Sequence, residues 1–173
     1  MTEKGFKIII YFAFLLVPMI MALYAAAYWL DVTASKNLLH AQIGFGAMLL
    51  AFAGGEYMGT LRYTFLDPPP LPAHESPLRD SSSLGLILLF LAFIALNNLA
   101  QSRTNLTMLA LAHAFVIPGF ILIMYIDRRL LHYKIQPTWF TRIRMYGCSI
   151  ALAALAISGV KLYTQMLEVY VRG

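Results

Sequence analysis

A single acidic side chain, Glu56, stands inside a long apolar stretch of the sequence and is the first candidate for chemistry. The stretch, residues 37–62, is long enough to cross a bilayer, because a membrane helix takes about 20 mostly apolar residues. A carboxylate within such a segment is costly unless it is paired or close to water. We therefore interpret Glu56 as part of a structural ion pair or as a proton site, and we predict that it pairs with Arg142 or Arg144.

Polar side chains near the opposite ends of the apolar segments form a second set of candidates. If the segments are helices packed side by side, these residues lie toward the membrane face opposite to Glu56, and we call them the outer polar layer. Polar side chains between membrane helices often hydrogen-bond to one another, with about 0.6 kcal/mol per bond on average. We favour such contacts between helices as their role. The members are His40, Gln42, Asn97, Asn98, His113 and Lys161.

His40 and His113 carry the imidazole group that haem iron and copper accept as a ligand. Their helix positions differ in depth by about five residues, which is near 8 Å at the helical rise. Neither histidine has a third ligand at a suitable spacing, so we expect no metal site, and no cofactor apart from a bound phospholipid. The sequence contains none of the common hydrolase, metalloprotease, phosphate-loop or dinucleotide motifs. We therefore expect a protein that is not an enzyme.

A basic and aromatic segment, residues 127–144, follows the fourth apolar run. Arginines together with tryptophan and phenylalanine are typical of the boundary between membrane and water on the cytoplasmic side. We predict that four of these side chains contact lipid headgroups. They are Arg128, Arg129, Trp139 and Phe140.

Small residues recur within the stretch that holds Glu56. Ala47, Ala51, Gly55 and Gly59 are each four residues apart, and Gly54 lies beside them. A helix places such residues on one stripe, which allows a second helix backbone to approach closely. We predict that this stripe packs against another helix, of this chain or of a partner. Small residues also occur along the last apolar run, at Gly147, Ala151, Ala154, Ser158 and Gly159.

The composition is that of a membrane protein. Of the 173 residues, 60% are hydrophobic and 12% are charged, whereas a soluble domain carries about twice that charged fraction. The net charge of +5 does not indicate nucleic-acid binding, because basic residues collect in the cytoplasmic loops of membrane proteins. Membrane lipids are the expected partners. The single cysteine, Cys148, excludes a disulfide framework.

The apolar runs predict one all-α domain, a bundle of five transmembrane helices that spans residues 1–173. Pro18 is expected to kink the first helix, and Pro118 with Gly119 to interrupt the fourth. In a bundle of five spans, nine of the 13 lysines and arginines lie on the same side of the membrane as the N-terminus. This excess predicts an N-in, C-out orientation. The helices are expected at residues 7–30, 38–61, 84–100, 106–126 and 145–166, with a proline-rich cytoplasmic loop at 62–83 and a basic cytoplasmic loop at 127–144.

Two motifs resemble the transmembrane protein 69 family. The run LAFAGGEYMG, residues 50–59, is similar to a Gly-Gly motif of the family, and PTWFTRIR, residues 137–144, is similar to a second motif. Met58 departs from the first motif, where the family has tryptophan. The resemblance implies a multi-pass protein of five helices in the bacterial inner membrane or the mitochondrial inner membrane, and it implies no reaction. The matching residues are Phe52, Gly54, Gly55 and Gly59 in the first motif, and Pro137, Trp139, Phe140, Ile143 and Arg144 in the second.

These observations favour a non-catalytic function. The stripe of small residues and the lack of a catalytic set of side chains predict a small accessory or assembly subunit. Such a subunit packs against a larger complex of the inner membrane, such as a respiratory or other redox enzyme. The alternative is a small transporter or ion-conducting protein that uses Glu56 and the outer polar layer.

Overall fold

The computed structural model describes residues 8, 11–30, 35–66, 77–102, 105–133 and 136–172, with the side chains of residues 35, 59–66, 77–80, 82 and 172 outside the description. The regular elements within these residues are helices, so the prediction of an all-α fold is confirmed. In chain order they are a π-helical turn, η1 (Phe12–Leu16), and the α-helices α2 (Val17–Leu30), α3 (Ser35–Leu66), α4 (Pro77–Gln101), α5 (Leu106–His132) and α6 (Thr138–Arg172).

Five helical segments are long and apolar enough to cross a membrane. They correspond to η1 with α2, and to α3, α4, α5 and α6, as the apolar runs of the sequence predict. The described part of the chain is therefore compatible with a multi-pass membrane protein.

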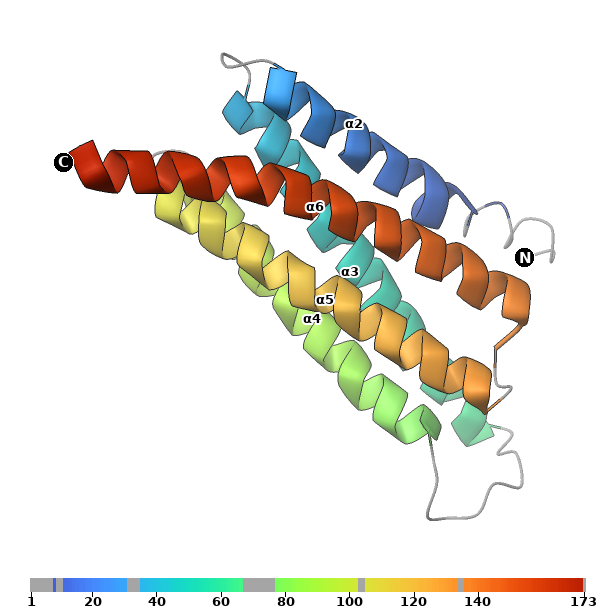
Figure 1. Ribbon diagram of the computed structural model, residues 1–173. Coiled ribbons are helices and arrows are strands. Elements are labelled where there is room, and N and C mark those ends of the chain that lie inside the picture. Colours follow the sequence, from blue (N-terminus) through green and yellow to red (C-terminus); the bar gives the residue numbers. More distant parts are fainter. Residues whose placement is uncertain are drawn as a thin grey trace.

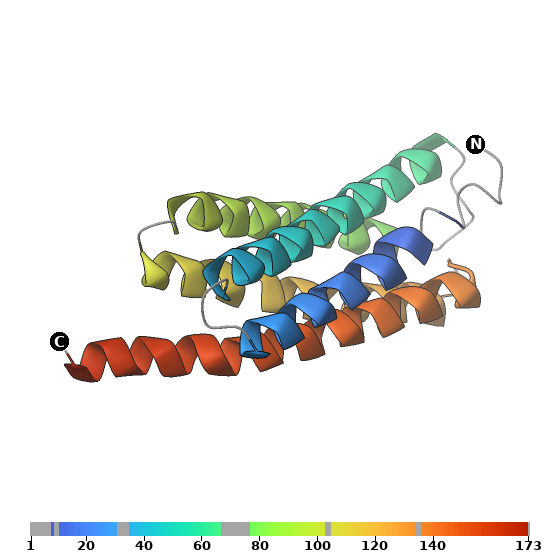
Figure 2. The same ribbon diagram turned by 90° about the horizontal axis from the view of Figure 1, so that it is seen from above.

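The helices form a ring in which each helix packs against its neighbours in the chain, and α6 closes the ring against α2 (Figures 1 and 2). Helix α3 also contacts α5 across the ring. Helices α2 and α6 run in the same direction, and the last turns of α6 extend beyond the bundle. This arrangement places side chains of α3, α5 and α6 toward one shared interior.

Several helices are longer than predicted, and both long loops are shorter. Helix α3 continues to Leu66 and α4 begins at Pro77, so the predicted loop at 62–83 is helical at both ends. The proline run at 67–72 lies outside the described residues. The predicted basic loop at 127–144 is likewise divided between the end of α5 and the start of α6. Hydropathy identifies only the apolar part of a helix, and charged residues such as arginine continue a helix readily.

The first helix changes its hydrogen bonding near Pro18, the position of the expected kink. The π-helical turn η1 lies directly before α2, and Pro18 is the second residue of α2. Proline has no N–H group, so it cannot bond to the carbonyl group of Phe14, four residues earlier. That carbonyl group lies against Gly147 of α6, where a side chain would overlap it. The proline and the glycine thus belong to one close contact between helices.

The predicted interruption of the fourth helix is wrong. Helix α5 runs without a break through Pro118 and Gly119. Pro118 is exposed on the outside of the bundle, while Gly119 is buried and its backbone lies against the side chain of Leu50. Membrane helices tolerate proline because local adjustments satisfy the freed carbonyl group. The absence of a side chain at Gly119 allows α3 to pack closely against α5.

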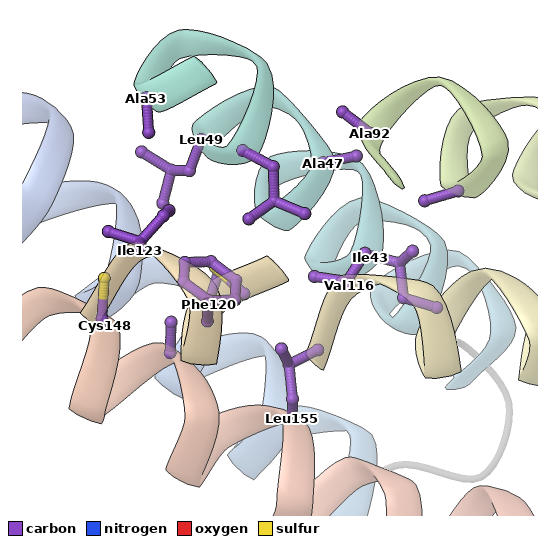
Figure 3. Close-up of a cluster of buried hydrophobic side chains, with 14 of the residues drawn as sticks. Ile43, Ala47, Leu49, Ala53, Ala92, Val116, Phe120, Ile123, Cys148 and Leu155 are labelled. Carbon is purple, nitrogen blue, oxygen red and sulfur yellow. The ribbon is translucent and has the colours of Figure 1, made fainter. Parts of the chain in front are cut away.

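The buried core takes side chains from all five long helices, and Figure 3 shows the part of it around α3, α5 and α6. The ring of Phe120 on α5 occupies its middle, with Leu49 and Ala53 of α3 on one side and Leu155 of α6 on the other. Phe120 and Leu155 are fully buried. This part of the core packs α3, α5 and α6 together, and these three helices carry the charged side chains described below.

The predicted stripe of small residues on α3 does not face one helix. Ala47 is buried and Ala51 is half-buried, but Gly55 is exposed, and Gly59 lies where side chains are outside the description. The close contact is made instead by Gly54, where a Cβ atom would lie 2.8 Å from the carbonyl oxygen of Gly85 on α4. An α-helix has 3.6 residues per turn, so a repeat of four drifts around the helix. Gly55 has therefore left the face that Ala47 occupies.

Leucine at Gly54 is expected to destabilise the bundle, and leucine at Gly55 is expected to be tolerated. At Gly54 the new side chain would push the α4 backbone away, at a cost of about 1–3 kcal/mol or more. At Gly55, no atom of the described residues outside its own helical turn lies within 4 Å of a Cβ atom. Thermal unfolding of Gly54→Leu and Gly55→Leu in the same detergent tests this difference. Equal unfolding temperatures for the two neighbouring variants would contradict the assignment of Gly54 to the contact.

Candidate functional site

Arg144 of α6 is the centre of a buried cluster of charged groups. Its side chain is 0% exposed, and its Nη1 donates a hydrogen bond of 3.0 Å to Oε2 of Glu56 on α3. Its Nε lies 3.0 Å from Oδ2 of Asp127 on α5, an ion-pair contact that lacks the alignment of a hydrogen bond. One guanidinium group therefore links two carboxylates on two other helices. We call Glu56, Tyr57, Asp127 and Arg144 the Arg144 cluster.

Tyr57 completes the Arg144 cluster. Its hydroxyl group donates a hydrogen bond of 2.6 Å to Oδ1 of Asp127 and accepts one from Nη2 of Arg144. The two oxygens of Asp127 thus face different partners, because Oδ1 binds tyrosine and Oδ2 faces the arginine. Buried charges are stable only when such partners replace the water that they lose.

Three aromatic rings surround the guanidinium group of Arg144. Its carbon Cζ lies 4.8 Å from the ring centre of Phe14, 4.6 Å from that of Tyr57 and 5.0 Å from that of Phe140. Cations within about 6 Å of a ring centre are attracted to its face. Phe140 is also buried, so the prediction that it contacts lipid headgroups is wrong. Its ring faces inward and lies against the guanidinium group of Arg144, one helical turn later.

The predicted contact between Glu56 and Arg144 is present in the structure, while Arg142 is exposed and stands outside the cluster. The Glu56 side chain is 20% exposed, whereas Asp127 is fully buried. Glu56 is therefore the acid of the cluster that is accessible from outside the bundle.

Two members of the cluster were not predicted. Asp127 directly follows the fourth apolar run, so the sequence placed it at the start of a loop, whereas it is buried within α5. Tyr57 carries no charge and stands next to Glu56 in an apolar run, where it resembles any core aromatic residue. Helical periodicity is the signal in the sequence, because an acid directly after an apolar run can still face the bundle interior if the helix continues.

The histidines of the outer polar layer bind separate partners. Nε2 of His40 lies 2.7 Å from the hydroxyl oxygen of Ser102. Nε2 of His113 donates to the carbonyl oxygen of Leu155 on α6, at 2.9 Å, and Gly159 leaves room for its imidazole ring. Among the described residues, no group of three or more histidine, cysteine, aspartate or glutamate side chains could hold a metal ion.

The other members of the layer do not form one connected group in the described residues. Lys161 donates to the carbonyl oxygen of Tyr28 and lies 4.6 Å from the Tyr28 ring centre, so it joins α6 to α2. Asn98 donates to the carbonyl oxygen of Ile94 in its own helix, and Asn97 is exposed. The side chain of Gln42 is fully buried, and its amide atoms have no hydrogen-bond partner among the described residues.

The remaining residues predicted to contact headgroups lie at the ends of α5 and α6. Arg128 is exposed and Arg129 is half-buried. Trp139 is half-buried, and its ring stacks on Tyr11 with the ring centres 6.4 Å apart. Arg128, Arg129 and Trp139 thus lie at the surface, where a contact with headgroups is sterically open to them.

No model of a protein family, no curated protein and no solved structure matches this chain. The resemblance to the transmembrane protein 69 family thus rests on the two sequence motifs alone.

Proposed function

We propose that this chain is a non-catalytic, multi-pass protein of the bacterial inner membrane or the mitochondrial inner membrane. In this proposal it is a small accessory or assembly subunit that packs against a larger membrane complex, such as a respiratory or other redox enzyme. The Arg144 cluster supports this function, because its charged groups bind each other and join α3, α5 and α6. Such contacts between charged groups stabilise the packing of the three helices.

The observation that carries the proposal is the outward face of α3. Gly55 is exposed there, and no atom of the described residues outside its own helical turn lies within 4 Å of a Cβ atom at this position. Met48 and Met58 are exposed on the same helix, at 62% and 38%. An exposed glycine between flexible apolar side chains allows a second helix backbone to approach closely in lipid. The proposed partner places a helix on this face.

The test uses a variant whose own fold is expected to be intact. Gly55→Leu fills the outward face of α3, so we expect normal thermal unfolding and loss of co-purification with a larger complex in mild detergent. The matched control is Phe93→Leu on α4, where the side chain is 67% exposed and distant in sequence from this face. Mass spectrometry of the purified material identifies the complex. Co-purification that is equal for wild type, Gly55→Leu and Phe93→Leu would refute the assignment of the partner to this face.

The orientation belongs to the same proposal and is predicted as N-in, C-out. A reporter protein fused after Gly173 is expected on the outer side of the membrane, and one inserted near Pro70 on the inner side. The physical reason is the excess of lysine and arginine on the side of the membrane where the N-terminus is placed. If both reporters report the same side, the arrangement of five spans is incorrect.

One observation favours the alternative, a small transporter or ion-conducting protein. Glu56 is partly exposed although it binds the fully buried Arg144, and intramembrane acids often mark proton paths. This alternative predicts a pH-dependent flux into liposomes that hold the purified protein, and it predicts that Glu56→Gln abolishes the flux while the fold persists. The accessory function predicts no such flux.

A further inference from the structure

A surface cavity with basic and aromatic walls lies at the C-terminal end of α5. Its volume is about 310 Å³. The lining residues follow one face of the helix, because they are spaced by three or four residues from one turn to the next. They are Tyr125, Arg128, Arg129, His132 and Tyr133.

A second cavity adjoins the first at Tyr125, which lines both. It has a volume of about 480 Å³ and lies between α4 and α5, which pack side by side along the bundle (Figures 1 and 2). Its walls are apolar, and it extends from Tyr125 toward the middle of α5 at Pro118. The other lining residues are Leu84, Ile87, Leu91, Ile121 and Leu122.

We propose that the two cavities form one binding site for an anionic phospholipid. The phosphate group binds at the basic cavity, with Arg128 as its principal contact, and an acyl chain lies in the apolar groove. The inference rests on the membrane placement in the proposed function, and it is independent of the larger complex.

The charges at the end of α5 support an anionic ligand. Asp127 is turned inward to Arg144, whereas the next residue, Arg128, is exposed to the outside. Arg128 therefore contributes its charge to the cavity while its neighbour in the chain belongs to the Arg144 cluster. Arginine binds phosphate through several N–H groups at once, and tyrosine side chains such as Tyr125 and Tyr133 favour the depth of the headgroups.

The direction and length of the groove support an acyl chain. Arg128 and Pro118 are ten residues apart on one helix, which is about 15 Å along its axis. That distance is about half of the hydrocarbon core, which is roughly 30 Å thick, and so equals the depth of one leaflet. An acyl chain whose phosphate lies at Arg128 would follow the groove toward the middle of the bundle.

The headgroup part is tested by native mass spectrometry of the delipidated protein with added phosphatidylglycerol or phosphatidylcholine of equal chain length. We expect preferential binding of phosphatidylglycerol, and a loss of about fivefold in affinity for Arg128→Gln, which removes one basic contact. Arg142→Gln is the matched control, since Arg142 is exposed, basic and outside the cavity. Equal affinities for Arg128→Gln and Arg142→Gln would overturn the site.

The groove is tested by Ile87→Trp, because Ile87 of α4 lines the groove and does not line the basic cavity. We expect a loss of at least fivefold in phosphatidylglycerol affinity, and no loss for the control Phe93→Trp on the same helix. Glycerol phosphate tests whether the phosphate belongs to a lipid or to a free phosphate compound. If it binds as tightly as the lipid and Ile87→Trp has no effect, the site holds a free phosphate compound and the lipid assignment is wrong. Both measurements use the purified chain alone, so their outcome is separate from that of the co-purification experiment.

Discussion

Replacing Arg144 by glutamine is expected to destabilise the protein by about 3–5 kcal/mol, because the change leaves two buried carboxylates without their cation. Asp127 is 0% exposed and Glu56 is 20% exposed, so the cost arises mainly at Asp127. Asp127→Asn is accordingly expected to cost more than Glu56→Gln.

The same cluster predicts a recovery of stability. Once Glu56→Gln and Asp127→Asn have removed both negative charges, Arg144 is a buried cation without a counter-charge, so adding Arg144→Gln is expected to restore part of the lost stability. Neutralising Glu56 alone is not expected to rescue Arg144→Gln, because Asp127 remains buried and charged. A buried ion pair adds little net stability over a neutral replacement, although breaking one is costly. The cluster is thus expected to behave as one unit of three charges.

Cys148 provides the measurement. It is the single cysteine of the chain, it is buried, and it lies one helical turn after Arg144. A thiol-reactive fluorescent dye added during heating reports when this part of the bundle opens. Arg142→Gln is the control, since this arginine is exposed on the same helix. Losses that add up across the variants, with no recovery in the triple variant, would show that the three groups do not interact.

The apolar runs predict the five long helices. The contact between Glu56 and Arg144 is predicted from the cost of charge in an apolar chain. A carboxylate and a guanidinium group are both costly away from water, so each requires a partner, and few candidates are available in such an apolar chain. The choice between Arg142 and Arg144 depends on which side of α6 faces the bundle. That side is set by packing: Arg144 turns inward and Arg142 remains exposed.

The sequence does not distinguish Gly54 from Gly55. Both glycines stand in one helix, and a difference of one residue turns the backbone by about 100°. The approach of Gly85 on α4 decides that Gly54 is buried and that Gly55 faces outward. Tyr57 illustrates the same limit, since its role depends on the position of Arg144, which lies far away in the chain.

Alanine at Gly147 is expected to destabilise the protein strongly. A Cβ atom at this position of α6 would overlap the carbonyl oxygen of Phe14 and would lie 2.8 Å from its carbonyl carbon. Both are backbone atoms, so no side-chain rotation can relieve the overlap and the first helix must move away from α6. Overpacking of a tight interior costs about 1–3 kcal/mol and occasionally more. The displaced segment also carries the Phe14 ring that covers Arg144.

The control for this variant is Gly55→Ala. The two variants are expected to change the stability of the protein in opposite directions. Alanine stabilises the middle of a helix by about 0.5–1 kcal/mol relative to glycine when space permits. No described atom outside its own helical turn lies within 4 Å of a Cβ atom at position 55. Thermal unfolding followed by the helical circular dichroism signal in detergent measures both variants. Gly55→Ala should unfold at the same temperature as wild type or higher, and Gly147→Ala well below it. If Gly147→Ala is as stable as Gly55→Ala, then η1 does not lie against α6 at Gly147, and the aromatic cover of Arg144 must come from elsewhere.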